Sequence, residues 1–134
     1  MAEGYLRTVV LLDTDISPIQ GARVILSDLA GNVLYDTITD EHGTVPIMTL
    51  PAPDAAVTLD PNYPGLPFAL YNMDVTKPGF HSTLIRYIEV LAGQTSTQPV
   101  TMHRATPEEI ARGGPPVEHI IIIGTRHPGL RPHG

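Results

Sequence analysis

The stretch FALYNMDVT, residues 68–76, decides the fold class of this chain of 134 residues. Its side chains alternate in character: positions 71, 73 and 75 are Tyr, Met and Val, whereas positions 72 and 74 are Asn and Asp. A period of two residues is that of a β-strand with one face on a core. The sequence KPGF, residues 77–80, follows at once and is typical of a turn. We therefore expect a half-buried strand and then a reversal of the chain.

Segments of the same kind recur along the first hundred residues, and Gly, Pro, Asn and Asp separate them as they separate strands. The further predicted strands cover residues 5–12, 22–27, 33–39, 44–50, 82–91 and 97–102, with a short one at 56–59. Pro46 cannot donate a main-chain hydrogen bond, so we expect the strand at 44–50 to be an edge strand or to be interrupted. Evenly spaced short strands without a helical period predict an all-β fold, an antiparallel seven-stranded sandwich.

The turn and core residues also carry a resemblance. The motifs are Gly21-Ala22-x-Val24, Thr39-Asp40-x-x-Gly43, Leu50-Pro51, Tyr71-x-Met73-x-Val75 and Lys77-x-Gly79-Phe80, followed by Val90, Gly93, Val100 and Met102. Over residues 4–103 the chain resembles the carboxypeptidase regulatory-like domain, a transthyretin-like and immunoglobulin-like sandwich. Within that group it is similar to the domain at the front of clostridial spore cortex-lytic enzymes and related spore peptidoglycan proteins.

The segments that carry this second likeness are residues 51–53, 99–102 and 115–121. The resemblance implies an accessory, adhesive or structural module, because such sandwiches host many functions. Residues 104–134 do not resemble the catalytic domain that follows in those proteins. We therefore expect this chain to hold no catalytic part.

Three parts of the chain are expected: a sandwich domain at 1–103, a linker at 104–116 and a C-terminal strand extension at 117–134. In the linker, Thr106 is placed to cap a helix, Pro107 suits its first position, and Glu109 stands three residues after the cap. Gly113 would end that helix after one or two turns. The linker is long enough to let the extension reach its own domain or a neighbouring copy.

The extension contains four consecutive isoleucines, which are apolar on both faces of an extended strand. Such a strand fits best where both faces are covered. It can fold back on its own sheet, or it can add to a neighbouring copy, and the sequence leaves both open. The predicted subunit interface comprises Val117, His119, Ile120, Ile121, Ile122 and Ile123 of the donated strand and Val9, Val10, Leu11 and Leu12 of the receiving domain.

Composition limits the partners. Residues 1–103 carry four basic and eleven acidic side chains, and residues 104–134 carry four basic and three acidic ones. An acidic body repels nucleic acid and anionic membranes, so we expect neither as a partner. Cysteine is absent, which excludes disulfides and thiol chemistry. The longest apolar run near the N-terminus, VVLL at 9–12, is too short for a signal peptide or a membrane span.

Residues with catalytic or metal-binding potential are present but form no known motif. The six histidines are His42, His81, His103, His119, His127 and His133, and their spacing fits no metal motif, so we expect solvated loop positions and no metal or cofactor. The acidic pairs at 13 and 15 and at 40 and 41 suggest solvated turns in place of a calcium loop. No serine lies in a nucleophile elbow, so we expect no enzyme activity.

These observations predict a structural subunit of an extracellular or spore-surface filament, which polymerises with itself by donating its C-terminal strand. Without a signal peptide, release by lysis is one route and a cytoplasmic location the alternative. The alternative function is a peptidoglycan- or carbohydrate-binding module that stacks sugars on Tyr63, Phe68, Tyr71, Phe80 and Tyr87. A third possibility is a regulatory domain for a catalytic partner on another chain. Cell-wall or spore material is a possible further partner.

Overall fold

A computed structural model describes residues 2–54, 68–112 and 118–122. Several predicted features lie outside these residues: the short strand at 56–59, and residues Tyr63, Val117, Ile123, His127 and His133. In the described part, no helix is long and apolar enough to cross a membrane.

The described residues form strands in the places that the alternation predicts. The elements are β1 (Ala2–Leu12), β2 (Arg23–Asp28), β3 (Val33–Ile38), β4 (Met48–Ala52), β5 (Ala69–Thr76), β6 (Ser82–Val90), β7 (Thr95–Met102), α2 (Pro107–Arg112) and β8 (Glu118–Ile122). The all-β sandwich is confirmed. Most predicted boundaries agree to within one or two residues, and β1 and β4 differ by more. The predicted strand at 44–50 begins later, because Pro46 falls outside the ladder that starts at Met48.

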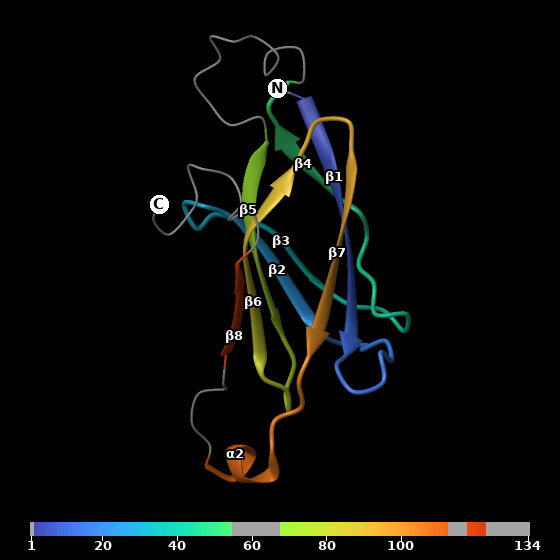
Figure 1. Cartoon of the computed structure of the whole chain (residues 1–134), viewed down its shortest axis with the longest axis vertical. Coiled ribbons are helices and arrows are strands. Elements are labelled where there is room, and N and C mark those ends of the chain that lie inside the picture. The colour runs from blue at the N-terminus through green and yellow to red at the C-terminus, as the bar shows by residue number, and fades with distance from the viewer. Residues whose placement is uncertain (1, 55–67, 113–117, 123–134) are drawn as a thin grey trace.

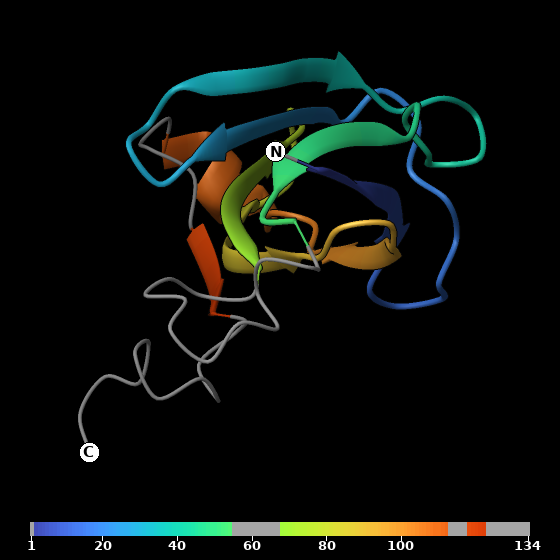
Figure 2. The same ribbon diagram turned by 90° about the horizontal axis from the view of Figure 1, so that it is seen from above.

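The strands form two sheets that enclose one core. One sheet has the order β4-β1-β7 and the other the order β3-β2-β5-β6-β8. Figure 1 shows β8 beside β6 at one edge of the larger sheet, with α2 at the end of the sandwich. Figure 2, seen from above, shows the strands arranged around a common interior. β4 is an edge strand, as Pro46 predicted.

The expectation of a purely antiparallel sandwich is wrong for two pairs of strands. β1 runs parallel to β7, and β6 runs parallel to β8. Parallel neighbours need a crossover connection. The chain between β6 and β8 supplies one, since it passes through β7 in the opposite sheet and then through α2.

The core is built from the inward residues of the alternating strands. Its members with no exposed surface include Leu6, Val10, Val24, Leu26, Met48, Met73, Val75, Ile85, Val90, Val100 and Met102. Leucine, valine, isoleucine and methionine dominate this set, and full burial of each such side chain contributes roughly 1.5–3 kcal/mol. The sandwich therefore has a core of its own that does not depend on β8.

A bulge in β6 interrupts its regular pairing with β5. The pairing of β5 with β6 shifts between Tyr71 and Met73, and Tyr87 adopts a positive φ of 63°. The Asn72 side chain satisfies the displaced main chain, since its Oδ1 accepts a hydrogen bond of 3.2 Å from the Tyr87 amide. The described pairing of β8 with β6 reaches Arg86, next to this bulge.

Candidate functional site

The C-terminal strand is docked on the sandwich of its own chain. Five residues of β8 pair with Ser82 to Arg86 of β6 in parallel register, and Ile120 lies beside Leu84. Along this stretch β6 is covered closely: the side chains from Ser82 to Ile85 are all buried. The edge of β6 that pairs with β8 is therefore a binding site for an extended segment. We call this edge, from Ser82 to Arg86, the seat, and it is the candidate functional site.

The two faces of β8 differ in what they meet. His119 and Ile121 share the inner face with Thr83 and Ile85, because residues in register point to the same side of a sheet. The outer face carries Ile120 and Ile122. Within the chain, 61% of Ile120, 41% of Ile121 and 51% of Ile122 is exposed. Within the described residues β8 therefore lies at the edge of the sheet with its isoleucines about half exposed, and the coverage of both its faces stays a prediction.

Apolar burial alone does not hold β8 in place. With about half of each side chain buried, the three isoleucines contribute on the order of 1 kcal/mol each. Ordering the main chain of a five-residue strand costs roughly 1–2 kcal/mol per residue. Main-chain hydrogen bonds to β6 and side-chain contacts must therefore supply the rest of the free energy that keeps β8 docked.

A cluster of three histidines and two carboxylates makes the principal side-chain contacts at this site; we name it the histidine cluster. It comprises His81, His103, His119, Asp13 and Glu109. His119 Nε2 lies 2.8 Å from His81 Nδ1, and the other nitrogen of His81 lies 2.8 Å from Glu109 Oε1. His103 Nδ1 lies 2.6 Å from Asp13 Oδ2. The His119 ring stacks near both other rings, with centroids 4.9 Å from His81 and 4.4 Å from His103.

The ends of the strands hold the cluster together. His81 directly precedes β6 and His103 directly follows β7, and the His81 amide donates a 2.8 Å hydrogen bond to the His103 carbonyl. Asp13 directly follows β1, which runs parallel to β7, so these two chain ends lie side by side. The side chain of His81 is only 14% exposed. The sandwich and α2 therefore supply four of the five side chains of the cluster, and β8 supplies only His119.

Helix α2 positions Glu109 through the capping box that the sequence predicted. The Glu109 amide donates to Thr106 Oγ1 at 3.2 Å, and the Thr106 amide donates to Glu109 Oε1 at 2.7 Å. The hydrogen bonds from the Thr106 main chain and from His81 lower the pKa of Glu109 to about 2. Glu109 is therefore ionised in any physiological setting and acts as a fixed negative acceptor.

The prediction that the histidines are solvated loop residues is wrong for three of them. Only His42, exposed in a turn, matches that description among the described histidines. Within the described ranges, no group of three or more His, Asp or Glu side chains is arranged to hold a metal ion. The facing nitrogens of His81 and His119 lie 2.8 Å apart, at hydrogen-bond distance, whereas two nitrogens that each lie about 2.0–2.1 Å from a tetrahedral zinc ion are farther apart.

The predicted receiving residues, Val9 to Leu12, occupy a different place from the one expected. They belong to β1, the central strand of its sheet, and β7 pairs with them throughout. On the other side, the Val10 amide donates to Gly43 and the Leu12 amide donates to Ser17. A donated strand cannot add to β1 without displacing these partners, and a role of Val9 to Leu12 in a subunit interface stays a prediction.

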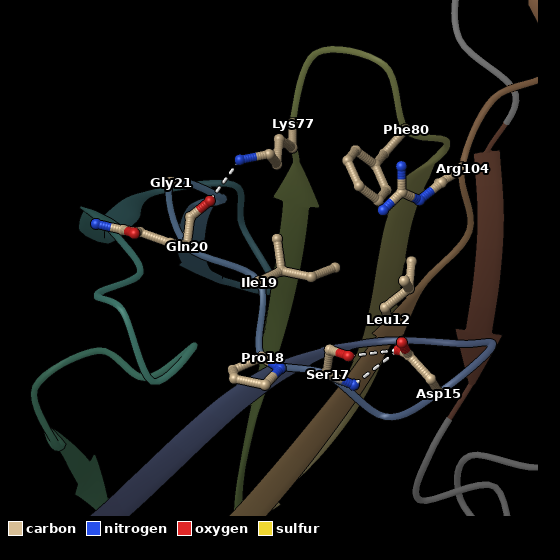
Figure 3. A pocket seen from close by; sticks show the side chains of 10 residues that line it. All are labelled: Leu12, Asp15, Ser17, Pro18, Ile19, Gln20, Gly21, Lys77, Phe80 and Arg104. Carbon is tan, nitrogen blue, oxygen red and sulfur yellow. Dashed lines mark hydrogen bonds between the residues drawn. The ribbon is translucent and has the colours of Figure 1, made fainter.

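An open pocket of about 660 Å³ lies at the same end of the sandwich as the histidine cluster. Figure 3 shows that Lys77, Asp15 and Ser17 turn toward partners within the chain, whereas the Gln20 side chain points away from them. Lys77 Nζ donates to the Gln20 carbonyl, and Arg104 lies 5.7 Å from the centre of the Phe80 ring. The Asp15 carboxylate accepts from the Ser17 hydroxyl at 2.6 Å and from its amide at 3.1 Å. Because these partners already bind one another, the pocket presents no evident ligand set.

The described aromatic residues do not form a sugar-stacking surface. Phe68 and Tyr71 are buried, and the Tyr71 hydroxyl donates to the Pro51 carbonyl at 2.5 Å. Phe80 and Tyr87 are half-buried. The structure therefore offers no exposed platform among these four residues for the alternative function.

Comparison with known proteins finds similarity in structure alone. No family model matches the chain, and no curated protein matches it. The TIE protein of Bacillus anthracis superposes with a TM-score of 0.54 at 16% identity, over 78% of this chain and 17% of that one. The minor pilin of Streptococcus agalactiae gives 0.53 at 15% identity, over 78% of this chain and 46% of the pilin. The 3-chlorocatechol 1,2-dioxygenase of Rhodococcus opacus gives 0.50 at 12% identity, over 77% and 60%.

At these identities the likeness shows the β-sandwich fold. The chain spans less than two thirds of the length of each of these three proteins. They include both a pilin and an enzyme, so the fold by itself does not select a function. The likeness to carboxypeptidase regulatory-like domains and to spore proteins stays a prediction.

Proposed function

We propose that this chain is a structural, non-catalytic subunit that assembles with copies of itself by exchanging β8. The observation that carries the proposal is the edge of β6, which accepts a five-residue parallel strand whose isoleucines remain 41–61% exposed on their own chain. The same β8 residues fit the same seat on a neighbouring copy, because the contacts are identical in both cases. Exchange of an identical element is a low-cost route to association.

The acceptor in this proposal is the β6 edge of the neighbour. It replaces the β1 residues that the sequence suggested. In residues 113–116 the sequence reads Gly-Gly-Pro-Pro, between α2 and β8, and this is the segment where the chain must change direction for exchange. The tail from residue 104 onward has a small positive net charge, whereas the body is acidic, which favours approach to another copy.

If each copy gives a strand to the next, the contact is heterologous and builds a ring or an open filament. A filament on the cell or spore surface is the setting that we propose for it, with cell-wall or spore material as a further partner. The presence of the fold in a bacterial minor pilin supports the class of function and nothing finer.

Two experiments test the exchange. Negative-stain electron microscopy with light scattering on the full chain should reveal rings or filaments in place of a 14.5 kDa monomer. The site of contact is tested with single-cysteine variants, since the chain has no cysteine of its own. A mixture of Leu84→Cys and Ile120→Cys chains should form a disulfide between copies on oxidation.

A matched mixture of Leu34→Cys and Ile120→Cys asks the same question of β3, the opposite edge of this sheet. It should give no such product. A uniform monomer, or a mixture of 84 and 120 variants that never links, would mean that β8 serves its own chain and that assembly by exchange is wrong.

A further inference from the structure

The histidine cluster joins the C-terminal strand to four other places in the fold. Asp13 follows β1, His81 precedes β6, His103 follows β7, Glu109 lies on α2, and His119 lies on β8. Four of these groups belong to the sandwich and its helix. The fifth, His119, leaves the cluster whenever β8 leaves its seat, so the state of the cluster and the docking of β8 are coupled.

The carboxylates determine where the protons lie. A carboxylate only accepts hydrogen bonds, so the ring nitrogens that face the carboxylates of Asp13 and Glu109 carry hydrogen. In a neutral His81 ring, Nε2 then donates to Glu109 and Nδ1 is an acceptor. His119 Nε2, 2.8 Å from that acceptor, donates to it. A single proton therefore fills the gap between the two rings.

We propose that the histidine cluster is a proton-operated latch: neutral histidines hold β8 on its own domain, and protonation releases it for exchange. Once both His81 and His119 are protonated, N–H groups stand on both sides of the 2.8 Å contact, because no nitrogen of either ring can then accept. The hydrogen bond is then replaced by two donors that face each other. His103 adds to the effect, because its ring lies 4.4 Å from that of His119 and a charge on both rings is repulsive.

The surrounding charges do not cancel this repulsion. Two carboxylates face three rings that can each carry a positive charge, so full protonation leaves the cluster with an excess of positive charge. Of the other charged groups nearby, Arg104 turns toward Phe80, and Glu118 lies exposed on the opposite face of β8 from His119. β8 itself therefore brings no carboxylate into the cluster.

Burial lowers the pKa of His119 below its ordinary value of 6.5, and the nearby His103 and His81 lower it further. Docked β8 thus binds a proton less readily than free β8. Docking is fully favoured above pH 6.5, where His119 of the free strand is neutral, and weakens as the pH falls below that value. The weakening ends below the lowered pKa of the docked form. Within this window the docking equilibrium changes by up to about tenfold per pH unit for each proton that docking excludes.

The latch is tested on the full-length chain, dilute enough to be monomeric and with a metal chelator present so that the response reports protons. Amide hydrogen exchange of Glu118 to Ile122 is measured near pH 7.5 and near pH 5, with correction for the intrinsic rates. Protection of β8 should fall at the lower pH, while β1 and β5 keep theirs. His119→Gln keeps a hydrogen-bonding side chain that does not titrate in this range, and it should lose most of the response.

His42→Gln is the matched control, since His42 lies outside the cluster, and it should behave like the parent chain. Protection of β8 that does not change with pH, or a response that survives His119→Gln intact, would overturn the latch. The use of the released strand rests on the proposed exchange between copies, which is measured separately by light scattering at high concentration. Acid release of β8 without assembly would refute the exchange alone, and assembly with pH-independent protection would refute the latch alone.

Discussion

A disulfide clamp between β6 and β8 should separate docking on the same chain from exchange. Leu84 and Ile120 are direct neighbours in the parallel register. Neighbouring strands lie about 4.8 Å apart, and this spacing is within the range that a disulfide spans. In the double variant Leu84→Cys/Ile120→Cys, oxidation of the dilute monomer should therefore close the clamp within one chain. The clamped chain cannot release β8 and should stay monomeric at every concentration and pH.

The size of the stabilisation follows from the length of the loop. The clamp closes a loop of about 36 residues, which in the chain-entropy model removes roughly 4 kcal/mol of unfolded-state freedom. For a chain of this size that corresponds to a rise in Tm on the order of 10–15 °C. Oxidised and reduced samples of the same variant are compared by calorimetry, so that the cost of replacing two apolar side chains cancels.

Reductant should restore both the lower Tm and assembly. Two results would refute the reasoning: assemblies of the clamped monomer that match those of the reduced chain, or a thiol pair that fails to close in the monomer at all. The first would show that β8 release is unnecessary for association. The second would show that β8 does not sit beside Leu84 in solution.

Three further predictions concern the parts that hold this site. Removing residues 117–134 should leave a folded monomer, seen as an unchanged β-sheet circular dichroism spectrum with no scattering from assemblies, because the core does not depend on β8. Thr106→Ala should cost roughly 1 kcal/mol of helix stability. It should also lower the protection of the β8 amides from hydrogen exchange, because α2 then holds Glu109 less firmly. Thr37→Ala on β3 is the control and should leave that protection unchanged. Gly43→Ala should lower the stability measured by urea unfolding by more than Gly31→Ala does. Both glycines have positive φ, but only at Gly43 would the new Cβ lie 2.4 Å from a main-chain oxygen, that of Val10. Equal losses of stability in the two variants would contradict this reasoning.

The strands and the helix cap could be predicted from the sequence because their causes are local. Alternation marks β5, and the spacing of Thr106 and Glu109 marks the start of α2. The parallel pairing of β8 with β6 has no local signature. It depends on a crossover through the opposite sheet, and the isoleucines give the same pattern in either direction.

The histidine cluster was missed for the same reason. Positions 81, 103 and 119 are far apart in sequence and carry no motif spacing, so their encounter depends on the topology. One signal was available once the strands were placed: His81 stands just before a strand, and Asp13 and His103 stand just after strands. Polar side chains at strand ends on one end of a sandwich can meet, and here the parallel pair β1 and β7 brings two of those ends together.

The two edges of the larger sheet explain why association between copies is expected at all. β3 forms one edge, where 59% of Val33 and 63% of Ile38 is exposed, and β8 forms the other. Exposed apolar edge strands are sites of self-association, which proteins ordinarily guard against with charge or proline. Ile120 to Ile122 carry no such guard. In the proposed exchange β8 keeps the same contacts on the neighbouring copy, so these isoleucines stay exposed, and we expect a second contact between copies to form through them.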